Sequence, residues 1–436
     1  MKFKNDLYIQ KKILIYGLGV SGISCLNHLK NNNIVKCFDD NLKNLKRKKF
    51  KKYLISKKKI IQTVFDHIII SPGINSLKCS LRNYIEKNKI KICTDLDVFY
   101  SKYSNNFIIA ITGTNGKSTS SKLLNDILKK NNYDSRLVGN IGNAVLNEKK
   151  ISKKTIFVIE VSSYQISYNK IFKPNYGILL NISPDHIERH KTFNNYIKTK
   201  FALIFSQEKQ DFAFINKREP LFKKYLKSKK LSCKIINVKN KLSGQDYRLV
   251  KNPYFKSFNN QQNLSFILKV CLKLKIKKRI VFKVVNNFEP LKFRQQIIYD
   301  SNKLRIINDS KSTSFSSSTS LLNDLERIFW IVGGLPKSGD RFKLVKKENI
   351  KKIYIYGKYK SFFVKIFKNK FKYSKFFGLD QAIKQVLIDI KKDEVDRKIN
   401  LLFSPCAASF DRFKNFEERG KYFNYLISLY KIKNAK

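Results

Sequence analysis

Short apolar runs alternate with helix-like patterns along the whole chain. One such run ends at Ile111, and behind it leucine and isoleucine recur at helical spacing between Lys122 and Lys130. This alternation is typical of α/β proteins with parallel sheets, which is the fold class that we expect. The runs that we interpret as strands are Ile13–Tyr16, Val35–Phe38, Ile68–Ile70, Phe107–Ile111, Thr155–Val161, Tyr176–Ile182, Leu304–Ile307, Ile328–Val332 and Ile399–Phe403.

Two polar segments interrupt this pattern. Ser101–Asn106 separates the first group of strands from the second, and Asn286–Pro290 separates the second group from the third. The chain shows no fixed-period repeat and no long low-complexity tract. We therefore expect three domains, at residues 1–103, 104–290 and 291–436, each long enough to bury a core.

A glycine-rich turn, Gly113–Gly116, lies between the strand that ends at Ile111 and the helical pattern. Backbone N–H groups of such a turn point at anionic oxygens, and Lys117 adds a positive charge. Ser118 or Thr119 can hold magnesium. Ile111 stands where the first glycine of the full P-loop pattern would be. The context predicts a nucleoside triphosphate site, and the alternative is a glycine turn with a chance Gly-Lys-Ser.

The first domain opens with a Gly-x-Gly-x-x-Gly turn, Gly17–Gly22, and two acids, Asp39 and Asp40, end its next strand. In dinucleotide-binding folds, such glycines let a pyrophosphate approach the helix and the acid binds ribose hydroxyls. A second turn, Ser71–Gly73, follows another strand at the same sheet edge. NAD is one of several ligands that this pattern allows, and a packing turn without a ligand is the alternative.

An acid, Glu160, lies near the end of an otherwise apolar strand. A carboxylate at the carboxyl end of a strand beside a P-loop commonly holds the magnesium ion of a nucleotide. A buried acid without a cation would be costly, so we favour this role over a solvated strand-end glutamate.

The next strand leads into Asp185 and His186, and His190 follows four residues later. On a helix the two histidines would share a face, as zinc ligands do. The acid, Glu188, is however the third residue of the segment His186–His190, whereas the zinc motif His-Glu-x-x-His needs it as the second. We therefore expect a magnesium- or phosphate-facing role for Asp185 or His186 instead of zinc.

Basic residues far outnumber acidic ones, with 90 Lys and Arg against 32 Asp and Glu and a net charge of +58. Such a charge is typical of nucleic-acid or membrane-surface proteins. The alternative is compositional drift toward Lys, Asn, Ile, Phe and Tyr. The basic residues are spread through every segment, which favours drift, with a positive field that helps anionic substrates approach.

Seven cysteines are scattered along the chain without a Cys-x-x-Cys pair. This pattern argues against a disulfide framework or a zinc ribbon and fits a reducing cytoplasm. The apolar segment Ile13–Leu26 mimics a signal peptide, but it contains the spaced glycines and ends in no small-residue cleavage site. No apolar stretch approaches the ~18 residues that span a bilayer. We expect a cytoplasmic protein without membrane insertion.

Four segments in order, Thr112–Thr119, Gly139–Gly142, Glu160–Gln165 and Asp185–His186, resemble the motifs of the Mur ligase family. Members of this family are ATP-dependent amide-bond ligases of peptidoglycan synthesis, related to folylpolyglutamate synthases. The resemblance covers nearly the whole chain. It implies a Rossmann-like first domain for a UDP-linked substrate, a central P-loop domain with a mostly parallel sheet for ATP, and a Rossmann-like last domain for the amino acid and ATP.

The resemblance also implies catalytic roles for central residues. Lys117 would hold ATP phosphates, and Asn140 would lie near the carboxylate substrate. Glu160 and His186 would serve magnesium. The implied magnesium ligands are Ser118, Glu160, His186 and Lys200. The implied residues for the UDP substrate are Gly17, Leu18, Gly19, Ser21, Gly22, Asp39, Asp40, Ser71, Gly73 and Asn140.

A lysine carbamylated by carbon dioxide completes the metal site of this family. The alignment of Tyr196–Lys200 with the family's Tyr-x-x-x-Lys pattern places it on Lys200, with Lys198 as the rival. A carbamate presents carboxylate-like oxygens that magnesium accepts, whereas a free ammonium repels the ion.

The adenine side of the ATP site is expected near Asn260 and Asn263, which resemble the family's His-Asn-x-x-Asn motif with Asn259 in place of histidine. Arg294 resembles a nucleotide-contacting arginine, although Phe293 stands where a histidine is common. The implied ATP-binding residues are Gly113, Thr114, Asn115, Gly116, Lys117, Ser118, Thr119, Asn260, Asn263, Arg294, Asp309 and Lys311.

Two late segments, Asn308–Ser314 and Ser404–Phe416, resemble the branch of the family that adds D-glutamate. The branches that add L-alanine, a diamino acid or a dipeptide carry a Tyr-Gly-His, Tyr-Ala-His or Tyr-Asn-Ala type motif in place of Ser310–Ser312. Asp309 would bind the ATP ribose. A dicarboxylic amino acid needs two anion sites. The implied D-glutamate residues are Lys311, Thr313, Ser409, Phe410 and Phe416, with Lys337 and Lys358 as weaker candidates.

The resemblance therefore implies a ligase that adds D-glutamate to UDP-N-acetylmuramoyl-L-alanine through an acyl phosphate, with ATP and magnesium. We expect a monomer that binds no nucleic acid and whose last domain closes over the substrates. Three alternatives stay open. They are another amide ligase of the family, an NAD oxidoreductase based on Gly17–Gly22, and a nucleic-acid-stimulated ATPase based on the charge.

Overall fold

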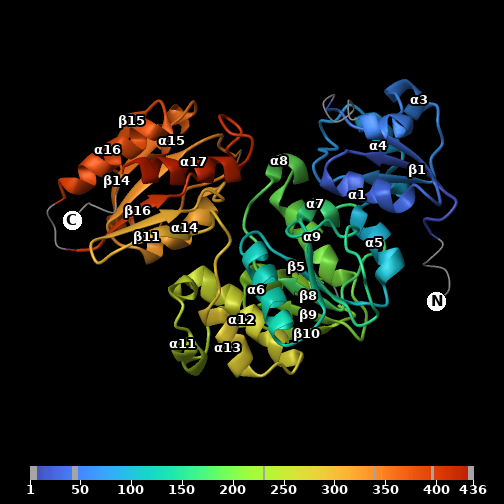
Figure 1. Cartoon of the computed structure of the whole chain (residues 1–436), viewed down its shortest axis with the longest axis horizontal. Helices are drawn as coiled ribbons and strands as arrows, with labels where there is room; N and C mark the ends of the chain where they lie inside the picture. The colour runs from blue at the N-terminus through green and yellow to red at the C-terminus, as the bar shows by residue number, and fades with distance from the viewer. Residues whose placement is uncertain are drawn as a thin grey trace. The chain divides into compact units, whose positions relative to one another are not determined.

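The computed structural model describes residues 7–41, 48–228, 231–337, 339–344, 346–393 and 397–430. Its strands form three sheets, and the α/β fold class is confirmed (Figure 1). The first sheet has the order β2-β1-β3-β4, with β1 (Lys12–Tyr16), β2 (Ile34–Phe38), β3 (His67–Ile70) and β4 (Ile92–Cys93). All of its strand pairs are parallel.

The second sheet is also parallel throughout and has the order β10-β9-β8-β5-β7-β6. Its strands are β5 (Phe107–Thr112), β6 (Ser135–Gly139), β7 (Ile156–Glu160), β8 (Tyr176–Leu179), β9 (Phe212–Ile215) and β10 (Lys234–Asn237). Its central position gives β5 a neighbour on each side, β7 and β8.

The third sheet has the order β11-β12-β16-β13-β14-β15 and is parallel except for the edge pair of β11 and β12. Its strands are β11 (Gln296–Asp300), β12 (Leu304–Asn308), β13 (Ile328–Gly333), β14 (Ile350–Tyr356), β15 (Tyr373–Phe376) and β16 (Ile399–Phe403). The sequence patterns did not predict the antiparallel edge strand β11.

Helices connect these strands, as parallel pairing requires. The helices are α1 (Val20–Leu29), α3 (Lys57–Ile61), α4 (Arg82–Lys87), α5 (Asp95–Tyr103), α6 (Lys117–Lys130), α7 (Ser163–Ile166), α8 (Ile187–His190), α9 (Phe193–Phe205), α10 (Pro220–Ser228), α11 (Gly244–Leu249), α12 (Phe258–Lys273), α13 (Lys278–Asn286), α14 (Phe315–Asp324), α15 (Lys360–Phe367), α16 (Leu379–Lys391) and α17 (Phe416–Leu429). Short 3-10 turns lie at Lys48–Tyr53, Lys89–Lys91, Pro253–Lys256 and Lys347–Asn349.

Each sheet buries both of its faces. Along β1, Ile13 and Ile15 belong to one hydrophobic cluster, and Leu14 and Tyr16 belong to the cluster on the opposite face. The second and third sheets are likewise packed on two sides. Strands that are buried on both faces read as continuous apolar runs, which is why they were recognisable in the sequence.

The chain divides into two compact units, and the first contains two of the sheets. The described parts of Met1–Ile182, Arg189–Leu242 and Gln262–Val285 form the first unit, and those of Ser183–Glu188, Ser243–Gln261 and Asn286–Lys436 form the second. Within the first unit, α5 contributes Leu96 and Phe99 to the core of the second sheet and Val98 to the core of the first. The expected boundary at residue 103 therefore follows a helix that both cores share, and the three-domain division stays a prediction.

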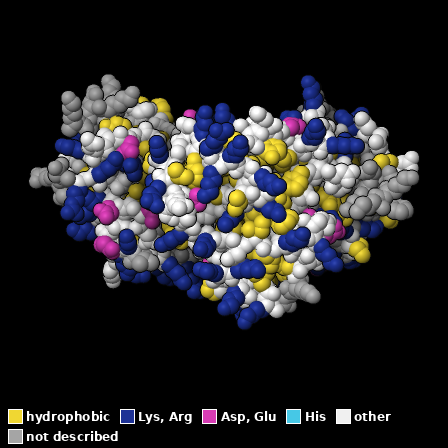
Figure 2. Space-filling view, turned by 90° about the horizontal axis from the view of Figure 1, so that it is seen from below, with side chains coloured by type: hydrophobic (Ala, Val, Ile, Leu, Met, Phe, Trp, Pro, Cys, Tyr) yellow, Lys and Arg dark blue, Asp and Glu magenta, His cyan; other side chains and the backbone are white. Residues whose placement is uncertain are grey.

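None of the helices in the described residues has the length and apolar character needed to cross a bilayer. All seven cysteines lie in the described residues and are free thiols there. Figure 2 shows Lys and Arg side chains spread across the visible face, with few acidic side chains among them.

Candidate active site

The P-loop connects the central strand β5 to α6. Gly116 has a φ of +82°, a left-handed conformation that favours glycine. A Cβ atom at this position would collide with the side-chain amide of Asn263, so Asn263 lies against the loop. Lys117 donates hydrogen bonds of 2.8 Å to the carbonyl oxygens of Gly113 and Thr114. The side chain of Lys117, which would bind phosphates, therefore lies against the P-loop, whose backbone N–H groups would also bind them.

Lys200 approaches the same loop from α9. Its side chain is 1% exposed, and its Nζ atom donates to the Gly113 carbonyl oxygen at 2.8 Å and to Thr112 Oγ1 at 3.3 Å. The ammonium also lies 4.9 Å from the centre of the Tyr196 ring. Lys198, the rival position, is exposed. Of the two lysines, Lys200 is the one beside the P-loop.

Glu160 ends β7 in register with Ile111 of β5 and Gly139 of β6. Its side chain is buried, and Oε1 accepts a 2.8 Å hydrogen bond from the Asn140 amide. Within the described structure, the buried Oε2 atom has no hydrogen-bond partner. A buried carboxylate oxygen without a donor fits a hard cation such as magnesium, because a metal ion compensates the lost hydration.

Ser118 is buried at the start of α6, where its hydroxyl is the second oxygen donor that the sequence proposed. The described residues contain no cluster of three or more His, Cys, Asp and Glu side chains that could hold a metal ion. The two oxygen donors expected in the first unit, those of Ser118 and Glu160, are of the kind that magnesium prefers.

The glycine turn of the first sheet borders a cavity of about 470 Å³. Gly17 has a φ of +99°, and a Cβ at Gly22 would collide with the Gly17 carbonyl oxygen, so α1 packs directly on the turn. The cavity is lined by Gly17, Gly19, Val20, Ser21, Asp39, Ser71, Pro72, Gly73, Ile74, Gly139, Asn140, Gly142, Ala144 and Gln165.

Three of the expected substrate residues, Leu18, Gly22 and Asp40, do not line this cavity. Leu18 donates its backbone N–H to Asp39, and Gly22 packs beneath the turn. Asp40 accepts hydrogen bonds from the Tyr16 and Ser80 hydroxyls. Burial raises the pKa of Asp40, but these hydrogen bonds outweigh it and hold the pKa below its usual value.

Asn140 and Gln165 join the cavity to the central sheet. Asn140 lines the cavity and donates to Glu160, so it touches both regions. Gln165 donates to the buried carboxylate of Asp95 at 3.2 Å. Sequence reasoning assigned no role to Gln165 or Asp95, although Gln165 ends one of the recognised segments.

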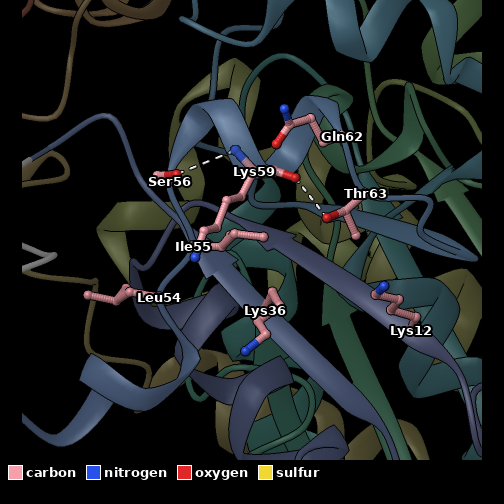
Figure 3. A pocket seen from close by; sticks show the side chains of 8 residues that line it. All are labelled: Lys12, Lys36, Leu54, Ile55, Ser56, Lys59, Gln62 and Thr63. Atoms are coloured by element: carbon pink, nitrogen blue, oxygen red, sulfur yellow. Dashed lines mark hydrogen bonds between the residues drawn. The ribbon is translucent and has the colours of Figure 1, made fainter.

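A second cavity, of about 420 Å³, lies beside β1 and β2 of the first sheet (Figure 3). Lys12, Lys36 and Lys59 line it, and it shares no residue with the glycine cavity. In a chain with 90 basic residues, three lysines around one hollow follow from composition. We assign it no part of the site.

The two histidines do not share a helix face. His186 precedes α8 with a φ of +55°, because the chain turns there, and Asp185 accepts its backbone N–H. The His186 ring faces Asp185 at 3.4 Å and Glu188 at 3.6 Å, and a hydrogen bond from His186 lowers the pKa of Glu188. His190 belongs to the first unit, where its ring contacts Ser163 at 3.0 Å.

In the second unit, Asp309 follows β12 and is buried. It accepts hydrogen bonds from the Ser404 hydroxyl at 2.9 Å and from the Gln295 backbone at 3.0 Å. Burial raises the pKa of Asp309 to about 7, although these hydrogen bonds and nearby arginines oppose the shift. Asn260 donates to the Gln295 side chain at 2.9 Å, which places it beside this loop.

Phe416 brings two expected cations together. The Lys311 ammonium lies 4.0 Å from its ring centre, and the Arg294 guanidinium lies 6.0 Å away. Ser409 is buried, whereas Phe410 is 70% exposed.

The weaker lysine candidates differ in their surroundings. Lys337 pairs with Asp185 at 2.8 Å, and both belong to the second unit. Lys358 is exposed. The roles of all these residues toward substrates stay predictions.

A P-loop on a parallel sheet, beside a strand-end carboxylate and a glycine-lined cavity, defines an α/β nucleotide-binding protein. The family model for the Mur ligase middle domain matches residues 111–279, and the model for the Mur ligase MurD-like N-terminal domain matches residues 11–93. The chain belongs to the Mur ligase family.

Curated relatives match almost end to end. The UDP-N-acetylmuramoylalanine–D-glutamate ligase of Rickettsia prowazekii is 33% identical over 96% of this chain and 98% of its own length. The enzyme of the same name from Rickettsia felis is 32% identical over 95% of this chain and 96% of its own.

Solved structures show the same fold. MurF ligase from Thermotoga maritima in complex with ADP has a TM-score of 0.59 at 14% identity and covers 97% of this chain and 99% of its own. MurC from the same organism has a TM-score of 0.53 at 14% identity, and the match covers 97% of this chain and 100% of MurC.

Proposed function

We propose that this chain joins D-glutamate to the free carboxylate of UDP-N-acetylmuramoyl-L-alanine at the expense of ATP. The observation that carries the proposal is the position of Asn140, which lines the glycine cavity and donates to Glu160 beside the P-loop. A nucleotide-sugar in that cavity would present its carboxylate toward the triphosphate site. The names of the Rickettsia relatives supply the identity of both reactants.

In the first step, an oxygen of the alanyl carboxylate attacks the γ-phosphorus of ATP, and the bond to the ADP oxygen breaks. An acyl phosphate and ADP result. The P-loop amides and Lys117 stabilise the charge on the phosphoryl group in transfer. Magnesium, held by Glu160 and Ser118 with His186 and a carbamylated Lys200 as further proposed ligands, would add positive charge at those oxygens.

In the second step, the amine of D-glutamate attacks the acyl carbon, the carbon–oxygen bond to phosphate breaks, and the amine loses a proton. Lys311 and Thr313 would bind one carboxylate of the amino acid, and Ser409 with backbone N–H groups near Phe416 would bind the other. Asp309, Asn260 and Arg294 would hold the ribose and the adenine side of ATP. No covalent enzyme intermediate is needed.

The test is phosphate release by the purified chain with ATP and magnesium, across UDP-muramoyl acceptors and amino acids. We expect release, and a product heavier by one glutamyl residue in mass spectrometry, only with the L-alanyl acceptor and D-glutamate. Turnover with L-alanine, a diamino acid or a dipeptide in place of D-glutamate would identify another ligase of the family. No ligation with any pair would refute the proposal.

A further inference from the structure

Arg419 is the largest charged side chain that the second unit buries completely. It lies in the first turns of α17 and is 0% exposed. Its Nε atom donates to Ser310 Oγ at 3.1 Å, and its Nη2 atom donates to the Ser310 carbonyl oxygen at 2.7 Å. Burying a guanidinium is costly, and these two hydrogen bonds to Ser310 offset part of the cost. The buried Nη1 atom has no hydrogen-bond partner among the described residues.

Ser310 also bonds to the first residue of α17. Its hydroxyl donates to the Phe416 carbonyl oxygen at 2.9 Å. Asn308, two residues earlier, donates to the Gly420 carbonyl oxygen at 2.9 Å. The loop after β12 and the first turn of α17 are therefore held together at several points. Lys311 and Phe416, which sit on these two segments, are 4.0 Å apart from ammonium to ring centre.

The same guanidinium reaches a third loop. Gly334 has a φ of +123°, and a Cβ there would lie 3.0 Å from Arg419 Nη1 and 2.6 Å from the Ala408 carbonyl oxygen. This loop leads to Lys337. Arg419 thus touches, directly or through Ser310, the segments that carry Lys311, Phe416 and Lys337.

Two carboxyl groups, Asp309 and Asp411, lie close enough to Arg419 to interact with its charge. Burial raises the pKa of both Asp309 and Asp411, and the positive charge of Arg419 lowers both again in part. A lysine would keep the charge but not the planar fork that bonds two oxygens of Ser310 at once.

We propose that Arg419 is the positioning residue of the amino-acid subsite, fixing Lys311 and the backbone at Phe416 in the spacing that a dicarboxylic amino acid requires. The inference rests on the proposed function for the identity of that substrate. It assigns Arg419 no contact with the substrate itself.

The experiment compares Arg419→Lys with the matched control Arg305→Lys, in which an arginine of β12 loses its fork to Asp300 outside the site. For Arg419→Lys we expect the KM for D-glutamate to rise about tenfold or more, because two charge-assisted hydrogen bonds are replaced by one. The KM for the UDP-linked substrate should stay within about twofold in both variants.

Hydrogen exchange in the substrate-free protein provides a readout that does not depend on the reaction. Arg419→Lys should accelerate exchange in residues 308–314 and 416–420 and leave the first unit unchanged. Ser310→Ala removes the hydrogen bond to the Phe416 carbonyl oxygen and the one from Arg419 Nε, but keeps the bond from Arg419 Nη2 to the Ser310 carbonyl oxygen. It should show the same pattern and serves if the arginine variant does not fold.

An unchanged D-glutamate KM in an active Arg419→Lys enzyme, or unchanged exchange in both segments, overturns the inference. A wild-type chain that makes no glutamyl product refutes the proposed function instead, and the exchange result then decides the positioning role alone.

Discussion

Asp309 is a buried acid of the candidate site whose protonation makes the stability of the second unit depend on pH. Its pKa is about 7 in the folded chain, chiefly because of burial, against an ordinary value of 3.8. Between these values the folded state binds more protons than the unfolded state. The stability of the second unit therefore falls as pH rises through this window, and the favourable contribution of the protonated acid is fully present only below about 3.8.

Asp309→Asn should remove this dependence, because the amide keeps its hydrogen-bonding oxygen without a charge. Unfolding can be followed by the fluorescence of the single tryptophan, Trp330, which is buried in the second unit and donates to the Ser404 carbonyl oxygen. From about pH 5 to about pH 7 the variant should gain up to about 1.4 kcal/mol per pH unit relative to the wild type. Parallel pH profiles of the two proteins would contradict the assignment.

Lys200 and Lys198 make a matched pair on α9, one buried beside the P-loop and the other exposed. Lys200→Ala should lower kcat about 100-fold, because the proposed carbamate oxygens are lost next to Gly113. Added short carboxylic acids should restore part of the activity by entering the vacated space. Lys198→Ala should stay within about twofold of the wild type. The reverse result would move the carbamate to Lys198.

At the scale of the element, the close packing of α1 on the glycine turn that precedes it requires a glycine at position 22. A Cβ at Gly22 would collide with the Gly17 carbonyl oxygen, whereas a Cβ at Gly19 would meet no atom within 4 Å. Gly22→Ala should destabilise the ligand-free protein by about 1–3 kcal/mol, as overpacking does. Gly19→Ala should leave the midpoint of thermal unfolding nearly unchanged. Equal midpoints for both variants would show that α1 shifts freely.

The elements also show what could be predicted from the sequence. Strands buried on both faces stood out as apolar runs, and β16 begins and ends at the predicted residues. The edge strand β11 has only partly buried or exposed residues and pairs antiparallel, so it left no such run. The apolar run at residues 176–182 extends past β8, which ends at Leu179, because Leu180 is buried in the loop that follows the strand.

Candidate site residues could be recognised in the sequence where a local motif carried them, and their roles stay predictions. The P-loop, Glu160 and Asn140 lie on recognisable turns and strand ends. Arg419 was not predictable, because its partner Ser310 is 109 residues away and nothing local distinguishes a buried arginine from a surface one. The same holds for Gln165 and Asp95, which are 70 residues apart.

The charge of the whole molecule bears on every proposed reactant, because ATP, the UDP-linked acceptor and D-glutamate are all anions. A net charge of +58 spread over the surface attracts them over a distance that salt shortens (Figure 2). Raising the monovalent salt from about 0.01 M to about 0.1 M reduces the screening length from about 30 Å to about 10 Å.

We therefore expect the KM values for ATP and the UDP-linked acceptor to rise several-fold over this range of salt. The kcat at saturating substrate should stay constant, because the electric field of the protein speeds the association of substrates and does not act on substrate that is already bound. Sucrose at equal osmolality should have no such effect. Added DNA or RNA should lower the apparent affinity for substrates by competing for the surface, without stimulating turnover. KM values that do not change with salt would show that the net charge does not help the substrates to bind. Turnover that DNA or RNA stimulates would instead favour a nucleic-acid-dependent ATPase.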